Sequence, residues 1–266
     1  MKKQSEMNFM KTRFIRQIIF YGILLAIWEG LALAKVWPEY IFPSPLDVLR
    51  SLAEGFKDST FLVAIVISLR RIAVGYGISV ILGGLMGLAI SRFSIVKDTV
   101  GNLSLGLQTL PSICWLPLAL LWFGINEKAI YFVVIMGATF SITMATHAGV
   151  RNVQPIFIKA GRNMGARRMT LFREVIIPAA MPSILSGLKQ GWSFAWRSLM
   201  AGELLFVNLG LGHLLMMGRE LNDMSRVIAV MIVIAVISIL TDKFIFGAAE
   251  SHLQRKWGLD CTGICH

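Results

Sequence analysis

The sequence predicts an all-α integral membrane protein with about six transmembrane helices. Of the 266 residues, 56% are hydrophobic and only 15% are charged, whereas a soluble domain carries about 25% charged residues. The apolar residues gather in stretches that approach or exceed the roughly 20 residues needed to cross a bilayer. The net charge of +11 does not indicate nucleic-acid binding, because the basic residues crowd the N-terminus and one loop.

The first predicted span covers about residues 14–36 and follows a basic N-terminal tail, residues 1–13. Basic residues before an apolar stretch also resemble a cleavable signal peptide, but Ile18–Val36 is longer than a typical signal core. We therefore expect a retained first helix, which ends before a proline-rich turn. Residues 45–60 then predict a short amphipathic surface helix.

The second predicted span, residues 72–90, contains five glycines that favour close packing between membrane helices. The third lies within residues 100–125 and contains Pro111 and Pro117. Two prolines at membrane depth predict a kinked helix, or a helix preceded by a broken segment.

The remaining predicted spans are residues 129–147, 183–207 and 227–247. A long basic loop, residues 149–182, joins the first two of these. Because Lys and Arg are retained on the cytoplasmic side, we expect this loop and both termini to be cytoplasmic. The transmembrane domain is then residues 14–250, followed by a C-terminal tail, residues 251–266.

The basic loop carries a segment of helical character that suits docking against a soluble partner. On charge alone, the default interpretation is a solvated loop that merely fixes topology. It resembles the cytoplasmic motif of ABC importer permeases. In that motif, Glu-Ala-Ala is followed by three residues and a Gly, and then by nine residues and Ile-x-Leu-Pro. This chain has Lys159-Ala160-Gly161, then Gly165, then Val175–Pro178 at the same spacing.

In that family the segment is the coupling helix, which sits in a cleft of the ATPase subunit. The motif's acid is Lys159 here, which puts any salt bridge of that acid in doubt but not the docking role. The coupling residues that the resemblance implies are Pro155, Ile156, Lys159, Ala160, Gly161, Met164, Gly165 and Pro178.

Three further stretches resemble the nitrate, sulfonate and taurine permeases, and the resemblance covers about residues 40–250. They are Leu110–Pro117 with Leu121–Ile125, Ile177–Leu188, and Ala195–Glu203. The resemblance implies the type I ABC importer permease fold in a bacterial inner membrane. It also implies two copies of an ATPase subunit, a second permease copy and an extracytoplasmic substrate-binding protein.

No Gly-x-x-x-x-Gly-Lys-Ser/Thr phosphate loop occurs in the sequence, so we expect no ATP binding and no enzymatic activity in this chain. ATP and Mg²⁺ are expected on the partner ATPase. No zinc motif is present, so no cofactor or metal is expected. Cys261, Cys265 and His266 are expected to form a free tail rather than a metal site.

Arg197 is the main candidate for the translocation pathway, because a charge within a span must face a partner or a water-filled path. It either attracts an anionic substrate or forms an ion pair with Glu203 or Glu29, and the sequence favours neither. The pathway candidates are Pro111, Ser112, Trp115, Ser193, Trp196, Arg197 and Glu203.

The sequence therefore predicts the permease subunit of an ATP-driven importer for a small anionic solute such as a sulfonate, taurine or nitrate. Two alternatives come from other classes. An ion-coupled secondary carrier would work without an ATPase. A membrane enzyme would need a cluster of His, Asp or Glu, and the four histidines are scattered along the chain.

Overall fold

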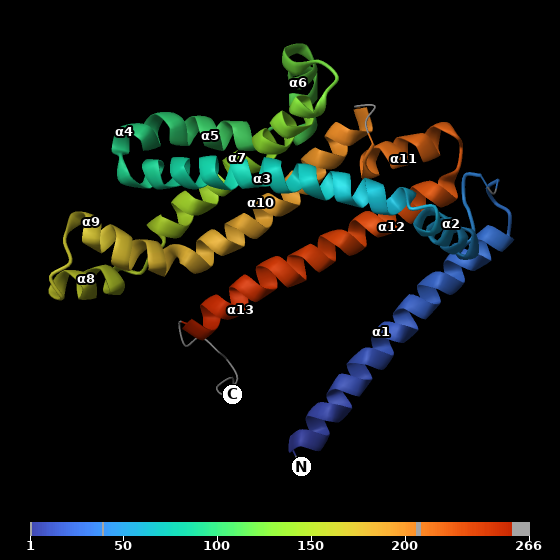
Figure 1. Ribbon diagram of the computed structural model, residues 1–266. Helices are drawn as coiled ribbons and strands as arrows, with labels where there is room; N and C mark the ends of the chain where they lie inside the picture. The colour runs from blue at the N-terminus through green and yellow to red at the C-terminus, as the bar shows by residue number, and fades with distance from the viewer. Residues whose placement is uncertain (1, 39, 206–208, 257–266) are drawn as a thin grey trace. The chain divides into compact units, whose positions relative to one another are not determined.

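The computed structural model describes residues 2–38, 40–205 and 209–256, and every regular element within these ranges is helical (Figure 1). This confirms the all-α expectation. The chain divides into two compact units. The first contains Met1–Leu62 and Leu214–Val233, and the second contains Val63–His213 and Ile234–His266. Cys261, Cys265 and His266, which are expected to form a free tail, lie outside the described residues.

The first unit holds α1 (Lys2–Leu33) and α2 (Pro45–Lys57), with parts of α11 (Leu211–Glu220) and α12 (Met224–Thr241). Helix α1 begins at Lys2, so it includes residues that the sequence suggested were a tail. The surface helix expected at residues 45–60 is present and ends three residues earlier. Its start is fixed by a capping box, because the Ser44 hydroxyl accepts from the Asp47 amide and the Asp47 carboxylate accepts from Ser44.

The second unit holds the remaining helices. They are α3 (Thr60–Arg92), α4 (Ser94–Val96), η1 (Lys97–Gly101), α5 (Asn102–Gln108), η2 (Ser112–Trp115), α6 (Leu116–Phe123), α7 (Glu127–Arg151), α8 (Pro155–Asn163), α9 (Arg168–Leu171), η3 (Phe172–Ile176), α10 (Ile177–Leu205), η4 (Asp242–Phe246) and α13 (Gly247–Lys256). Three of these, η1, η3 and η4, are single π-helical turns within longer helices, and η2 is a 3₁₀ turn.

Helices α3 and α7 run in the same direction (Figure 1). Three contacts in register show this. Arg71 donates to Glu127 over 3.0 Å, Ser79 donates to the Ile135 carbonyl over 3.4 Å, and Ser91 lies 3.0 Å from His147. Because the two helices are parallel, the intervening segment must carry the chain back from the end of α3 to the level of its start.

Within the part of the chain that the structure describes, five helices are long and apolar enough to cross a membrane. A sixth crossing is formed if the bent pair Ser94–Gln108 and Ser112–Phe123, which turns by 105°, counts as one span. The parallel packing of α3 and α7 requires this pair to cross whenever its two neighbours cross. The structure therefore favours six spans, as the sequence predicts.

Helices α7 and α10 pack closely and in opposite directions. A Cβ at Gly187 would overlap the Cβ of Ala145, and a Cβ at Gly191 would lie 2.6 Å from the side chain of Ile142. Small residues let membrane helices approach backbone to backbone. The contact depends on the absence of a side chain at these two positions of α10.

The last part of the predicted basic loop, residues 149–182, is helical. Helix starts at Arg168 in α9 and continues through η3 into α10. Pro178 lies inside this continuous helix, directly after the wider turn η3, which accommodates a residue that lacks an amide donor. The last span is also longer than expected, because α12 continues through η4 and α13 to Lys256.

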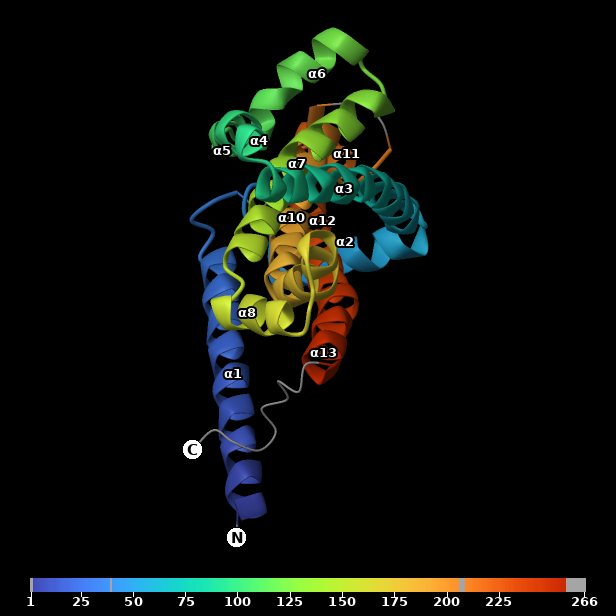
Figure 2. The same ribbon diagram turned by 90° about the vertical axis from the view of Figure 1, so that its left-hand side faces the viewer.

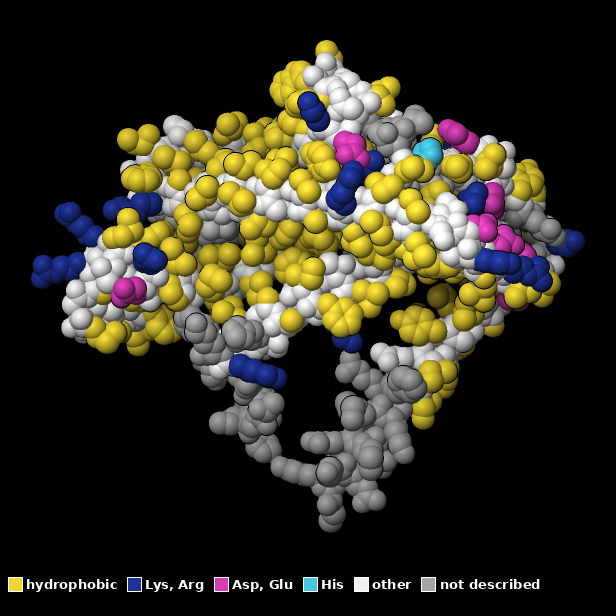
Figure 3. Space-filling model, in the orientation of Figure 1, with side chains coloured by type: hydrophobic (Ala, Val, Ile, Leu, Met, Phe, Trp, Pro, Cys, Tyr) yellow, Lys and Arg dark blue, Asp and Glu magenta, His cyan; other side chains and the backbone are white. Residues whose placement is uncertain are grey.

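The surface of the second unit changes character towards the end that holds α8 and α9. Hydrophobic side chains cover the face over α3, whereas Lys and Arg project where α8 and α9 lie (Figure 3). Figure 2 shows α8 lying crosswise at this end, in front of α10. The apolar face suits lipid or another membrane helix, and the charged end suits water.

Candidate functional site

A cavity of about 260 Å³ lies where the third span is broken. The backbone turns there between α5 and η2, and Pro111 is in an extended conformation with φ −54° and ψ 138°. Three elements form the walls, namely the break itself, α7 and α10. The lining residues are Leu107, Gln108, Thr109, Leu110, Pro111, Ser112, Met136, Gly137, Phe140, Phe194 and Arg197.

Gly137 of α7 allows these elements to meet. A Cβ at this position would overlap the Ser198 hydroxyl of α10 and lie 3.4 Å from the Cβ of Ser112. Ser198 itself is fully buried and donates to the Phe194 carbonyl over 2.9 Å. The absence of a side chain at Gly137 therefore sets how closely the break approaches α10.

Arg197 supplies the charge of this cavity. Its guanidinium carbon lies 5.3 Å from the centre of the Phe194 ring, a cation–π contact that fixes the side chain. It forms no ion pair with any residue that the structure describes. An arginine in a spanning helix that lacks an acidic partner is free to bind an anion.

The proposed ion pair between Arg197 and Glu203 is wrong. Glu203 is fully buried, and Arg71 donates to it over 3.0 Å. Ser68 donates to both carboxylate oxygens over 2.8 Å, and the Gly212 amide donates over 2.9 Å. Glu203 and Arg197 are six residues apart and so lie on different faces of α10. Glu29 lies in the first unit.

Arg71 joins this buried cluster to the start of α7. It donates to Glu127 over 3.0 Å and to the Leu209 carbonyl over 2.7 Å. The cluster thus ties α3 to the first turn of α7 and the end of α10. Its charges are satisfied internally, so Glu203 has a structural partner rather than a place in the cavity.

The structure brings together only some of the pathway candidates. Pro111, Ser112 and Arg197 line the cavity. Trp115 instead packs between Phe132 and Phe140, with ring centres 6.3 Å away in both cases. Trp196 is buried against Trp192, and Ser193 is exposed.

The sequence reasoning missed the remaining lining residues. The missed polar ones are Gln108 and Thr109, which directly precede the proline break. Their position beside Pro111 was a usable signal. The other missed residues carried no local signal that distinguishes them from the remaining residues of their spans; they are Leu107, Leu110, Met136, Gly137, Phe140 and Phe194.

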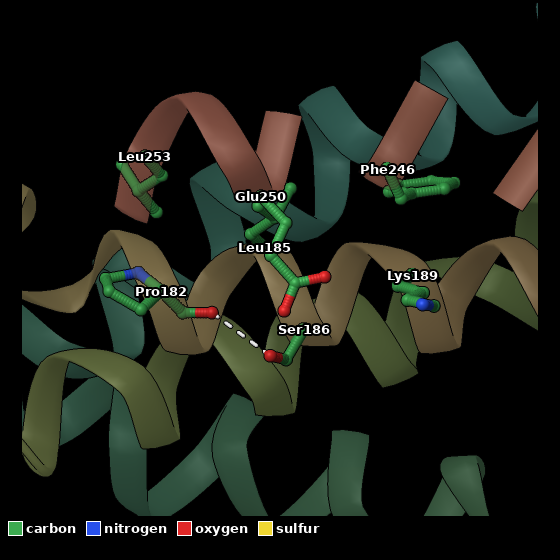
Figure 4. A pocket seen from close by; sticks show the side chains of 7 residues that line it. All are labelled: Pro182, Leu185, Ser186, Lys189, Phe246, Glu250 and Leu253. Carbon is green, nitrogen blue, oxygen red and sulfur yellow. Dashed lines mark hydrogen bonds between the residues drawn. The ribbon is translucent and has the colours of Figure 1, made fainter. Parts of the chain in front are cut away.

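A second cavity, of about 390 Å³, lies between α10 and the η4–α13 segment. Its lining residues are Pro182, Leu185, Ser186, Lys189, Phe246, Glu250 and Leu253. Figure 4 shows the Glu250 carboxylate directed towards Ser186. The cation that lines this cavity, Lys189, is neutralised, because it pairs with Asp242 over 3.0 Å. This cavity is therefore a weaker candidate for binding an anion.

The expected coupling segment forms a helical hairpin. Gly161 is the buried point of α8, because a Cβ there would lie 2.9 Å from both Leu171 and Val175. Gly165 ends the helix with φ +89°, its amide donates to Arg162, and the next amide donates to Gly161. This is a Schellman motif, which favours glycine at this position.

The other coupling candidates divide by exposure. Exposed side chains belong to Pro155, Ile156, Lys159, Ala160 and Met164. Pro178 is half-buried within α10. The two glycines and Pro178 therefore shape the hairpin, while the exposed residues are those that a partner would touch.

Residues 79–250 match the family model described as the binding-protein-dependent transport system inner membrane component. The chain belongs to this family. It is 31% identical to a putative ABC transporter permease protein of Methanocaldococcus jannaschii, over 91% of this chain and 92% of the relative. It is 30% identical to the taurine transport system permease protein TauC of Escherichia coli, over 83% and 82%.

Another relative is the nitrate import permease protein NrtB of Synechocystis, 26% identical over 92% of this chain and 91% of the relative. Solved structures show the same fold. The permease resembles a chain of the inward-facing methionine ABC transporter MetNI with a TM-score of 0.62, at 17% identity, covering 74% of this chain and 95% of that chain. An amino acid ABC transporter chain gives a TM-score of 0.57, at 21% identity, covering 77% and 97%.

These findings establish the class of the protein. It is a multi-pass inner membrane permease of an ABC import system, and the secondary-carrier alternative has no support. The relatives are transport components rather than enzymes. Among the described residues, no group of three or more His, Cys, Asp or Glu side chains is placed to hold a metal.

Proposed function

We propose that this permease forms the translocation pathway for a small anionic solute, and that Arg197 attracts the solute at the broken third span. The observation that carries this is a guanidinium in a membrane cavity without an acidic partner among the described residues. A charge at the centre of a membrane helix costs at least about 2.5–3.5 kcal/mol. A bound anion offsets that cost during transport.

The names of the relatives support the same solute class. One relative is a taurine permease and another is a nitrate permease, and taurine carries a sulfonate group while nitrate is an inorganic anion. Gln108, Thr109 and Ser112 add hydrogen-bonding groups on the wall formed by the break. Together with the guanidinium they suit an oxyanion, because a hydrogen bond to a charged acceptor is stronger than one between two neutral groups.

The energy comes from a separate ATPase, present in two copies with ATP and Mg²⁺, that docks on α8. A second copy of this chain completes the pathway, and an external binding protein delivers the solute. The cytoplasmic side is the one that holds α8 and both termini. Three features support this arrangement: the motif match around Gly165, the exposed face of α8 and the lack of a phosphate-binding loop in the sequence.

The test is ATP-driven uptake of labelled taurine and nitrate into proteoliposomes. The vesicles hold this permease with its ATPase and receive the binding protein outside. Arg197→Gln is expected to lower the uptake rate by about 10- to 100-fold, because a hydrogen bond to a charged group contributes about 1.5–3 kcal/mol. Arg197→Lys is expected to retain part of the rate, since it keeps the charge but loses the fork of donors.

Gln190→Ala is the matched control, because Gln190 is an exposed polar residue of the same helix that does not line the cavity. It is expected to transport like the unmodified permease. Uptake by Arg197→Gln at the unmodified rate would show that the anion does not depend on this side chain, and would reject the proposal.

A further inference from the structure

Among the exposed side chains of the α8 and α9 hairpin, four form a stripe along one side of α8, which we call the docking stripe. It consists of Ile156, Lys159, Ala160 and Asn163, and all four residues are exposed. Their spacing of three and four residues places them on one side of α8. The buried Gly161 lies on the other side, against Leu171 and Val175. The stripe is thus the surface that α8 presents away from its own chain.

The surroundings of the docking stripe are strongly basic. Four more exposed cations lie in the same segment of the chain, between α8 and η3: Arg162, Arg167, Arg168 and Arg173. Neither these arginines nor Lys159 forms an ion pair with a described residue. The sequence has no Asp or Glu from residue 128 to residue 173, and the exposed Glu174 is the only acid near the hairpin in the sequence. The positive charge at this end of the molecule is therefore not neutralised within the hairpin.

A membrane surface is a poor occupant for this stripe. Helices that lie in a bilayer interface separate an apolar face from a cationic face. On α8, Lys159 lies in the same stripe as Ile156 and Ala160, so the stripe cannot bury its apolar residues in lipid without also burying the ammonium. A protein cleft can cover both kinds of side chain, provided that it supplies an acidic group to the cation.

We infer that the ATPase cleft that receives α8 presents a carboxylate to Lys159 and an acidic rim to the flanking arginines. The inference rests on the proposed docking of an ATPase on this helix and adds the charge of the receiving surface. Where the motif begins with Glu, the permease would supply the acid of such a pair. In this chain Lys159 supplies the cation, so the ATPase must supply the acid. Charges across an interface are arranged to be complementary, and like charges opposite one another strongly disfavour association.

The experiment measures how much ATPase remains bound when the detergent-solubilised complex is purified through this chain. Lys159→Glu is expected to weaken the complex at least about tenfold, and Lys159→Gln is expected to have a smaller effect. The unmodified complex is expected to lose ATPase as the salt concentration rises, because salt screens exposed ion pairs. Replacing the facing ATPase carboxylate by Lys is expected to restore binding to the Lys159→Glu variant.

Lys97→Glu is the matched control, because Lys97 is an exposed lysine of η1, outside the hairpin. It is expected to leave ATPase binding unchanged. Ala160→Arg tests docking itself, since it adds bulk to the same stripe without adding an acid. If Ala160→Arg removes the ATPase while Lys159→Glu retains it fully, the ATPase docks there but its cleft is not acidic, and the inference is wrong.

If neither variant changes ATPase binding, the proposed docking fails and the inference fails with it. A lipid partner would give a third pattern. Binding would then depend on the anionic lipid content of reconstituted vesicles and not on the sign of the charge at residue 159, which would also overturn the inference.

Discussion

Arg70 and Arg71 are adjacent in α3 but lie in very different environments. Arg71 is nearly fully buried and pairs with the buried Glu203, while Arg70 is exposed and pairs with Glu127 over 2.8 Å. An exposed pair contributes about 0–1 kcal/mol. Breaking a buried pair costs more, because it leaves a charge without compensation in a low-dielectric region.

We therefore expect Glu203→Ala to lower the free energy of unfolding by about 3 kcal/mol, although Arg71 keeps Glu127 as a second partner. The measurement is an unfolding titration of the detergent-solubilised permease. Arg70→Gln is the control and is expected to cost less than about 1 kcal/mol. Equal losses for the two variants would mean that burial does not distinguish these pairs.

For single residues, the sequence revealed which charged side chains lie within the spans but not which residues they pair with. Arg197 was recognisable because it interrupts an apolar stretch, and the structure places it in a cavity. The partner of Glu203 was not recognisable, because Arg71 is 132 residues away in the chain. Which acid meets which base is decided by the packing of α3 on α10, and spacing along one helix carries no information about that.

The packing of α7 on α10 is the contact between elements that depends most on glycine. Gly187 has no space for a Cβ beside Ala145, whereas a Cβ at Gly84 of α3 would meet nothing within 4 Å. The sequence predicted close helix packing from the glycines of α3, whereas the glycines of α10 were not predicted to pack in this way. Both helices contain glycine, so composition alone does not tell which glycines form a contact.

Gly187→Val is expected to destabilise the permease by about 1–3 kcal/mol, the usual cost of an overpacked contact. The expected loss is measured as unfolding in detergent, with Gly84→Val as the matched control on a helix surface. Both variants place the same β-branched residue in a spanning helix, so the difference between them reports the α7–α10 contact. No difference would show that α10 can shift away from Ala145 at little cost.

The helix boundaries show where local sequence signals mislead. Pro178 and Pro182 suggested that the basic loop continued to residue 182, but α10 begins at Ile177 and runs through both prolines. A proline inside a helix looks the same in the sequence as a proline that ends one, and here the wider turn η3 directly before α10 accommodates Pro178. The broken third span was recognised correctly, because two prolines within one apolar stretch are costly in a straight helix.

At the scale of the whole molecule, the direction of each spanning helix follows from its neighbour. Helix α3 is parallel to α7, and α7 is antiparallel to α10. Figure 4 shows Leu253 level with Pro182 and Phe246 level with Lys189, so the last helix is antiparallel to α10. With the bent pair as one crossing, successive spans alternate in direction from α3 to the end of α13.

This alternation predicts the side of the membrane on which each connection lies. If α1 is the first crossing, six crossings would put both termini on one side, and we predict that this side is cytoplasmic because the hairpin of α8 is basic. A cysteine at Ser94 or Arg255 should therefore react with a membrane-impermeant thiol reagent only after permeabilisation. A cysteine at Lys128 should react in intact cells. Cys114, Cys261 and Cys265 are first replaced by Ser.

The position at Lys128 decides between the two readings of the bent pair. All three reporter positions are exposed, so burial does not limit their labelling. If Ser94–Phe123 only dipped into the membrane and returned, cysteines at residues 94 and 128 would react from the same side. Helices α3 and α7 would then cross in opposite directions, which their parallel contacts at Arg71, Ser79 and Ser91 do not allow. Reaction from opposite sides is therefore the outcome that this packing demands.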